Sequence, residues 1–289
     1  MTTRSHSQIS RRRFLRGAFR GGLGLTGAAI GAGSWARWVE PDWVEVTHHQ
    51  IKIPHLPPQF EGFRIAQISD IHIEDGDTAE HLPAICDLVN AQKADAIVVT
   101  GDYVTTPVLA DPAVLRRGLQ RLRAPAGVFG ITGNHDYYAV PDASLVSEML
   151  RPTPVQLMIN EVHVWHKNGA RLHLAGFDDF WVRPREFESM AARIPDGEAA
   201  IALGHEPDFA IEVAATHKFG LMLSGHSHGG QIALPFIGPV HVPDYAHKFP
   251  RGRYDVDAMT LYTNRGLGTV GIPMRFCARP EISVFTLKS

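Results

Sequence analysis

The chain has 289 residues, of which 44% are hydrophobic and 20% charged, so it can bury a large core and is too apolar for a disordered protein. Its net charge of −2 conceals an uneven distribution, because the first 40 residues hold seven arginines and one acidic residue, and the remainder holds 21 basic and 29 acidic side chains. That acidic remainder argues against a nucleic-acid partner. Two cysteines, Cys86 and Cys277, are too few for a disulfide scaffold or a cysteine-type zinc site, and whether they pair stays open.

Residues 1–40 have the composition of a targeting segment. Residues 10–15 read Ser-Arg-Arg-Arg-Phe-Leu, which fits the twin-arginine export pattern, and a Gly/Ala-rich stretch interrupted by Arg20 follows. A disordered basic arm is the alternative, but it does not account for the apolar stretch. A membrane span needs about 20 predominantly apolar residues, so a cleaved signal and a retained anchor are both open.

We therefore divide the chain into a signal or anchor with its linker at 1–40 and one catalytic domain at 41–289. The twin-arginine export machinery is the expected partner of the first segment. The expected location is the periplasm or the outer face of the cytoplasmic membrane, with membrane association.

Strand and helix patterns alternate from residue 44 onward. Apolar strands at 63–69, 96–100 and 128–132 are separated by apolar residues at helical spacing, within 82–89 and 115–122. This βαβαβ order predicts parallel strands whose carboxyl ends share one edge of a sheet.

The second half of the chain is predicted to hold shorter strands. Strands at 162–166 and 171–175 flank Asn168 and Gly169, which is a hairpin signal. Strands at 200–203 and 221–223 follow, and the former leads to a helix opened by Pro207. The tail segments 231–234, 259–263 and 282–287 have the pattern of antiparallel strands.

Five predicted strands end in side chains that bind hard or borderline cations: Asp70 and His72, Asp102, Asn134, His205, and His226 with His228. Each motif is weak alone, because Asp-x-His and Gly-Asp also occur in ordinary turns. Mixed carboxylate, amide and imidazole ligands favour manganese, iron or zinc over calcium. Seven ligands exceed one open site and suit two adjacent metal ions.

In this order the motifs resemble the calcineurin-like metallophosphoesterase family. The family pattern consists of five motifs: Asp-x-His, Gly-Asp, Gly-Asn-His-Asp, Gly-His and Gly-His-x-His. In this chain they occupy, in the same order, residues 70–72, 101–102, 133–136, 204–205 and 225–228. The twin-arginine start and the run 264–281 are similar to an exported, membrane-associated bacterial branch. The resemblance implies an α/β fold, a four-layer α-β-β-α sandwich with two mixed sheets. It also implies a dinuclear metal-dependent phosphoesterase.

The resemblance also implies a role for each motif residue. Asp70, His72 and His228 would hold the first divalent ion. Asn134, His205 and His226 would hold the second, and Asp102 would bridge the two. A hydroxide held between the ions would attack phosphorus in line. His135 would protonate the leaving group, because imidazole titrates near neutral pH.

The surroundings of these ligands suggest further roles. Asp136 would orient His135, although a turn-capping role is nearly as well supported. Asn134 would also donate to a phosphate oxygen. Arg265 and Arg275 are the leading candidates for binding substrate phosphate, with surface solubility as the alternative for each.

Two substrate classes remain open from the sequence. One is a phosphorylated lipid or nucleotide-sugar lipid, and the other is a soluble or cell-envelope phosphodiester. The apolar segment 234–239 would line an acyl-chain groove, face a bilayer or close the core. Asp178 and Asp179 have a turn or an outer-shell role. A non-catalytic metal-binding module of the same fold is the rival from another class.

Overall fold

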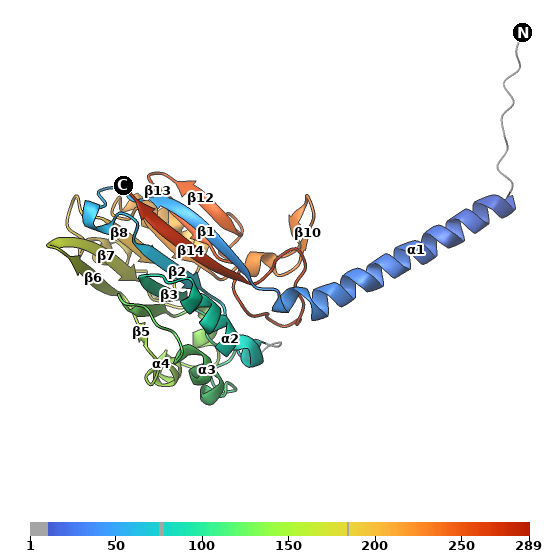
Figure 1. Ribbon diagram of the computed structural model, residues 1–289, viewed down its shortest axis with the longest axis horizontal. Coiled ribbons are helices and arrows are strands. Elements are labelled where there is room, and N and C mark those ends of the chain that lie inside the picture. The colour runs from blue at the N-terminus through green and yellow to red at the C-terminus, as the bar shows by residue number, and fades with distance from the viewer. Residues whose placement is uncertain (1–10, 75–77, 184) are drawn as a thin grey trace, which may run out of the picture.

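Two six-stranded mixed sheets pack face to face, and helices cover their outer faces (Figure 1). The computed structural model describes residues 11–74, 78–183 and 185–289. The first sheet has the order β1-β14-β2-β3-β4-β5. Its strands are β1 (Glu45–Lys52), β14 (Glu281–Lys288), β2 (Arg64–Ile68), β3 (Ala96–Thr100), β4 (Val128–Ile131) and β5 (Val155–Leu157).

The second sheet has the order β12-β13-β9-β8-β7-β6, and a separate two-stranded ladder joins β10 to β11. Its strands are β12 (Gly252–Val256), β13 (Met259–Thr263), β9 (Leu221–Ser224), β8 (Ala200–Leu203), β7 (Ala170–Gly176) and β6 (Glu161–Lys167). The small ladder consists of β10 (Ala233–Leu234) and β11 (Gly238–Pro239). The four-layer sandwich predicted from the sequence is confirmed.

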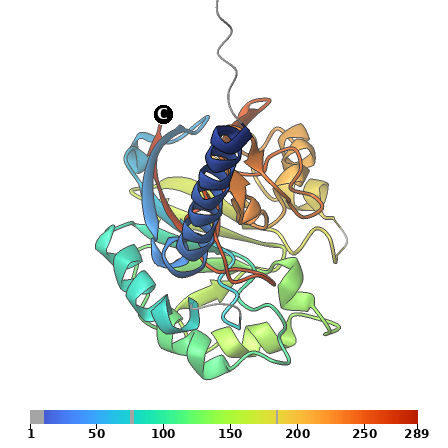
Figure 2. The ribbon, with the colours of Figure 1, turned by 90° about the vertical axis from the view of Figure 1, so that its right-hand side faces the viewer.

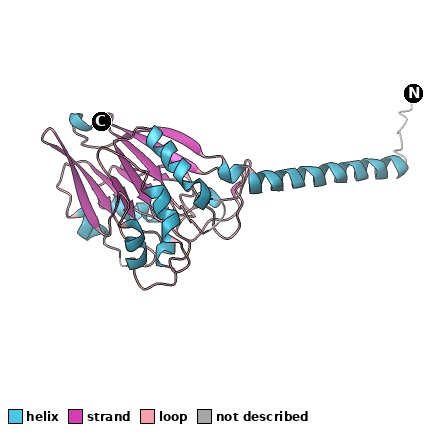
Figure 3. Cartoon of the chain, turned by 60° about the horizontal axis from the view of Figure 1, so that its bottom comes forward, coloured by secondary structure: helices cyan, strands magenta, loops and turns pink. Residues whose placement is uncertain are grey.

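Three apolar cores hold the four layers together. Successive strand residues face opposite cores, so Ile65 points between the sheets and Ala66 points toward the helices. The helices over the first sheet are α2 (Thr78–Ala91), α3 (Pro112–Leu119) and α4 (Ser144–Leu150), and those over the second are α5 (Phe187–Ala191) and α6 (Ala210–Ala215). Figure 3 shows the helices outside the strand layers.

The apolar residues predicted to share one face of α2 are buried as expected. Leu82, Ile85, Cys86 and Val89 all face the first core. Cys86 is buried and Cys277 is exposed, and both are free thiols. The hairpin prediction is also confirmed, because β6 and β7 pair antiparallel around Asn168 and Gly169, both with positive φ.

The tail strands differ from the antiparallel prediction. β14 inserts between β1 and β2, parallel to the former and antiparallel to the latter. β13 pairs antiparallel with β12 but parallel with β9. Segment 231–234 contributes only the two residues of β10. These pairings join residues far apart in sequence, so local patterns do not encode their direction.

Helix α1 (Arg11–Trp38) projects away from the two sheets (Figures 1 and 2). Its last turn is fixed to the body, because the Arg275 N–H donates to the Ala36 carbonyl at 2.9 Å. Trp35 donates to Glu40 at 3.0 Å. Within the described ranges, no helix has both the length and the apolar character to cross a membrane. The start of the predicted twin-arginine pattern, Ser10, lies outside the described residues.

Candidate metal centre

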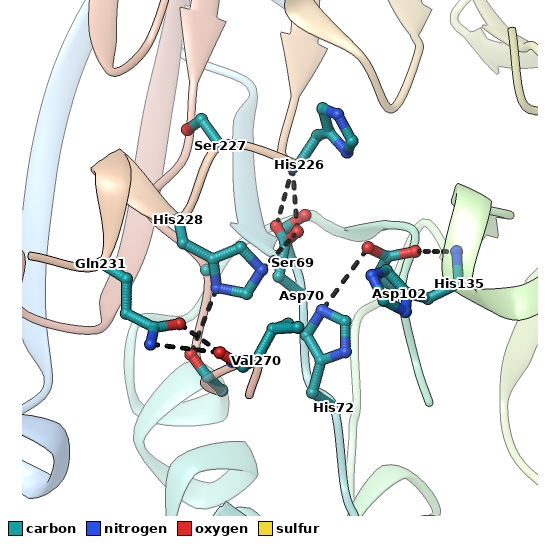
Figure 4. A network of polar contacts seen from close by, with 12 residues as sticks. Ser69, Asp70, His72, Asp102, His135, His226, Ser227, His228, Gln231 and Val270 are labelled. Carbon is teal, nitrogen blue, oxygen red and sulfur yellow. Dashed lines mark hydrogen bonds and ion pairs between the residues drawn. The ribbon is translucent and has the colours of Figure 1, made fainter. Parts of the chain in front are cut away.

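The seven predicted metal ligands meet in the cleft between the two sheets, at the carboxyl ends of β2, β3, β4, β8 and β9 (Figure 4 shows part of this network). All but Asn134 are buried. Two groups have ligand atoms within 4.8 Å of one another: Asp70 with His72 and His228, and Asp102 with His205 and His226. The structure therefore brings together side chains that are up to 158 positions apart in the chain.

Asp102 lies between the two groups. Its Oδ2 atom is 3.4 Å from His72 Nε2 and 3.1 Å from His205 Nε2, so one oxygen faces a histidine of each group. Its Oδ1 atom accepts the backbone N–H of His135 at 2.9 Å. This is the position that a bridging carboxylate requires.

The donor atoms fit a pair of metal ions. His72 Nε2, His205 Nε2 and Asn134 Oδ1 are buried without a hydrogen bond, and buried polar atoms are otherwise almost always paired. The opposite ring nitrogens are held, because His72 Nδ1 lies 3.1 Å from Thr105 Oγ1 and His205 Nδ1 lies 2.6 Å from the Thr100 carbonyl. Such outer contacts orient metal-binding histidines.

The electrostatics of the cleft differ among the ligand histidines: against the lowering effect of burial, Asp102 raises the pKa values of His72 and His205, whereas those of the other two histidines are lowered. Burial lowers the pKa of His228, as does the neighbouring His72, and burial likewise lowers the pKa of His226. Both rings are therefore neutral at pH 7, which is the form that binds metal. Burial alone would raise the pKa of Asp102, but His205 and His135 bring it well below its usual range, so this carboxylate is ionised.

The ligand residues have an unusual backbone. Asp70, His72, Asp102, His226 and His228 all have positive φ, between 45° and 69°. Each such residue typically costs about 1 to 3 kcal/mol, and such strain concentrates at functional sites. The strand-end motifs did not reveal this feature, since a positive φ at an Asp or His leaves no compositional trace.

Comparison with known proteins decides the family. The family model described as calcineurin-like phosphoesterase matches residues 63–230, which is more than half of the chain. The chain belongs to the calcineurin-like phosphoesterases. It is 38% identical to the metallophosphoesterase YkuE of Bacillus subtilis over 98% of this chain and 99% of YkuE. It is 27% identical to the phosphodiesterase YaeI of Escherichia coli, over 96% and 99% of the two chains.

A third relative is the UDP-2,3-diacylglucosamine pyrophosphatase LpxG of Chlamydia trachomatis, 27% identical over 86% of this chain and 90% of LpxG. The calcineurin-like phosphoesterase described here is thus a metal-dependent phosphoric ester hydrolase, and the predicted family is confirmed. The family uses a dinuclear divalent metal centre, and both ligand groups are present.

Gly225 packs directly against Asp70, a ligand of the first metal group, where a larger residue would not fit. A Cβ atom at Gly225 would overlap Ser69 Oγ and Asp70 Oδ2. Because Asp70 is a ligand, we expect Gly225→Ala to weaken metal binding by about 10- to 100-fold, as displacing an oriented ligand does. Titration with Mn²⁺ would measure this effect. Gly27→Ala, with open space around its Cβ, is the control, and unchanged affinity in Gly225→Ala would refute the packing argument.

His135 lies beside the metal ligands, but Asp136 does not orient it. The His135 Nδ1 atom lies 3.0 Å from the Thr105 carbonyl, which is therefore the group that fixes the ring. Asp136 is fully buried and accepts the backbone N–H groups of Gly133 and Asp102, each at 3.0 Å. The predicted orienting role is corrected, and the turn-capping alternative agrees with the Gly133 contact: Asp136 caps its own turn and fixes the loop that carries Asp102 through main-chain donors.

The two predicted substrate arginines bind the protein itself. Arg275 is fully buried, and its guanidinium donates to the carbonyls of Gly268 and Ala278. Arg265 pairs with two glutamates, one of them Glu281 at 2.9 Å. Neither side chain lines the pocket over the metal ligands. The prediction that these arginines bind substrate phosphate is therefore not supported, since both contact the C-terminal segment of the protein instead.

The metal ligands open into a cavity of about 560 Å³ with a largely apolar wall. The sequence reasoning missed most of this wall, which includes Trp181, Ile232, Val240, Pro243, Val270 and Ile272. These residues come from loops, and the apolar segment 234–239 that the sequence singled out lies next to the wall in the chain without contributing a lining residue. The lining residues that the structure describes include no lysine or arginine.

The loop after β7 positions the aromatic part of this wall. Asp179 accepts the backbone N–H of Trp181 at 3.1 Å, and burial together with Glu206 raises the pKa of Asp179 to about 10. The Trp181 ring then lies edge-on to His226, with centroids 5.9 Å apart. Asp178 accepts the Thr132 hydroxyl at 2.8 Å. The pair therefore organises the loop, which agrees with the turn interpretation made from the sequence, and the outer-shell role stays a prediction.

Proposed function

We propose that this phosphoesterase hydrolyses a phosphate ester or phosphoanhydride that carries an apolar group, using two divalent ions. The observation that supports it best is the position of Asp102 between the two ligand groups, with buried imidazole nitrogens lacking hydrogen bonds on either side. The first ion would be held by Asp70, His72 and His228, and the second by Asn134, His205 and His226. Manganese, iron and zinc all suit this donor set.

When bound, such ions supply a water nucleophile activated at neutral pH and neutralise charge on the phosphoryl oxygens. The protein orients the groups around them. The Asn134 amide offers a buried acceptor, Oδ1, to a cation and an N–H donor to a phosphoryl oxygen. The backbone N–H groups of Asp102 and Tyr103 donate to Asp136, which keeps the shared carboxylate in place.

His135 is the proposed proton donor to the leaving group. Its Nδ1 atom donates to the Thr105 carbonyl, which leaves Nε2 to exchange a proton with a group in the pocket. Imidazole is suited to this task because its unperturbed pKa lies near neutral pH. The backbone of His135 is tied to Asp102, so the acid and the bridging ligand keep a fixed relation.

The pocket supports the amphiphilic substrate class. Its apolar wall suits an acyl or prenyl portion next to the phosphorus, and its described lining residues include no lysine or arginine for a second free phosphate. LpxG is named for a pyrophosphatase activity on a diacylated sugar nucleotide, which agrees with this class. A soluble phosphodiester is the second candidate, because YaeI is named as a phosphodiesterase.

A hydrolysis screen separates the two candidates. The manganese-loaded protein would be tested on phosphomonoesters, soluble phosphodiesters and lipid pyrophosphates, with product release followed by phosphate or chromatographic assay. We expect the highest kcat/KM for a substrate with an apolar tail. A preference for soluble diesters would favour the second candidate, and no turnover of any class would refute the catalytic proposal.

We further propose export through the twin-arginine route, which the pattern at residues 10–15 supports. Replacing both Arg11 and Arg12 by lysine should retain the protein in the cytoplasm, because lysine keeps the charge but not the guanidinium group. Cell fractionation measures the outcome, with Arg16→Lys as the control. Export of the double variant at the normal level would contradict this route.

A further inference from the structure

An apolar hairpin stands at the mouth of the metal pocket. The turn between β10 and β11 exposes the whole Phe236 side chain and 78% of Ile237. At its base, the Val240 N–H donates to the Ile232 carbonyl at 2.9 Å, and both of these residues line the pocket. The exposed tip is therefore an outward continuation of the pocket wall.

The backbone of this turn is unfavourable for the residue that it carries. The Ile237 N–H donates to the Leu234 carbonyl at 3.2 Å, which closes a turn with Pro235 second and Phe236 third. Phe236 has φ +66°, a conformation that favours glycine or asparagine at the third position. The fully exposed Phe236 ring contributes nothing to the core, and an apolar surface outside this fold would bury it.

The hairpin shares one end of the molecule with the last turn of α1. The Phe276 N–H donates to the Gln231 carbonyl at 3.0 Å, and the preceding Arg275 N–H donates to the Ala36 carbonyl at 2.9 Å. One short segment thus contacts both the hairpin base and α1, and Figure 1 shows β10 beside the end of that helix. Trp38, at the C-terminal end of α1, is 67% exposed.

We propose that the tip formed by Leu234, Phe236 and Ile237 inserts into the interface of a phospholipid bilayer and holds the pocket mouth at headgroup level. Its exposed apolar side chains follow directly on the strand that continues from the apolar pocket wall, so one apolar phase would cover both. Trp38 is exposed at the end of α1 that lies near the hairpin base, and tryptophan is typical of bilayer interfaces, where an aromatic ring meets both phases. The inference rests on the proposed function, because an amphiphilic substrate would enter the pocket from that surface.

Continuity with α1 favours a bilayer over a second copy of the chain. Phe19 and Ile30 on this helix are also exposed, at 71% and 66%. A bilayer surface that received the hairpin would also lie next to the end of α1, which leaves the body beside the hairpin (Figure 1), and could bury these two side chains.

The decisive variant is Phe236→Asn in the full chain. Asparagine tolerates positive φ, so the turn should keep its shape and the thermal midpoint should stay equal or rise. Partitioning onto vesicles of phosphatidylethanolamine and phosphatidylglycerol should fall by about tenfold, the loss expected from one large apolar side chain. Ile159 is a partly exposed residue two positions after β5, a strand that lies away from β10 in Figure 1, so Ile159→Asn should bind vesicles normally. Equal partitioning of both variants and the wild type would overturn the proposal.

A fluorescent probe at residue 236 reports membrane contact of the hairpin separately from any vesicle binding by α1. A polarity-sensitive fluorophore on Phe236→Cys, in a Cys277→Ser background, should shift to the blue when vesicles are added. No shift, or a Phe236-dependent dimer in sedimentation without vesicles, would overturn bilayer insertion. Hydrolysis of soluble bis(p-nitrophenyl) phosphate should be the same in Phe236→Asn and wild type. Lost vesicle binding with intact hydrolysis thus supports the surface, whereas an inactive wild type counts only against the proposed catalysis.

Discussion

Replacing Asp102 by alanine or asparagine is expected to empty both halves of the metal centre. One Asp102 oxygen lies 3.1 Å from His205 and 3.4 Å from His72, so each ion would lose a ligand in the same substitution. Elemental analysis after incubation with Mn²⁺ should find far less than one ion per chain. Turnover of a soluble diester should fall by more than the ~100-fold that loss of an outer-shell partner can cost.

The Asp102→Asn variant separates loss of the metal ligand from loss of the folded structure. Asp102 has φ +52°, which asparagine tolerates, and an asparagine oxygen can still accept the His135 N–H. Asp255→Ala, at an exposed carboxylate on β12, is the matched control and should keep both ions. A folded Asp102→Asn protein that retains two ions at full affinity would refute the bridging role.

Replacing His135 by alanine is expected to slow hydrolysis according to the leaving group. A general acid contributes about 10²- to 10⁴-fold when the departing oxygen is basic, and little when it is a good leaving group. Turnover of alkyl phosphodiesters should therefore fall by about that range, whereas p-nitrophenyl esters should change by only a few fold. Metal content should be unchanged, because the hydrogen bond from His135 to Asp102 comes from its backbone N–H, which alanine keeps.

Rates measured for a series of leaving groups test whether His135 protonates the leaving group. A plot of log kcat against leaving-group pKa should be steeper for His135→Ala than for the wild type. His166→Ala, at an exposed histidine on β6, should follow the wild-type line. Parallel lines for His135→Ala and wild type would show that the residue does not protonate the leaving group.

The sequence was sufficient to predict which side chains meet at the centre of this fold. Buried parallel strands end at one edge of a sheet, so Asp70, Asp102 and Asn134 at successive strand ends had to lie together. The two-residue spacing of His226 and His228 at the end of β9 then placed one imidazole in reach of each group. The ordered motifs of a known family supplied the assignment of each ligand.

Features that depend on long-range contacts were not predictable in the same way. Arg275 was predicted to bind substrate on charge alone, but its guanidinium is buried against main-chain carbonyls from its own C-terminal segment. The role of Asp136 depends on backbone donors more than 30 residues away, and no local pattern records such a partner. The apolar pocket wall combines loops from both sheets, so its residues become a surface only after folding.

The most direct test of the dinuclear phosphoesterase is a metal titration of the purified chain with activity measured at each point. Mn²⁺ would be added to protein stripped by a chelator, and bound metal and turnover of a soluble phosphodiester would be recorded together. We predict two ions per chain at saturation, with turnover rising as the second ion binds. Full turnover with a single ion per chain, or without added metal, would contradict the proposal.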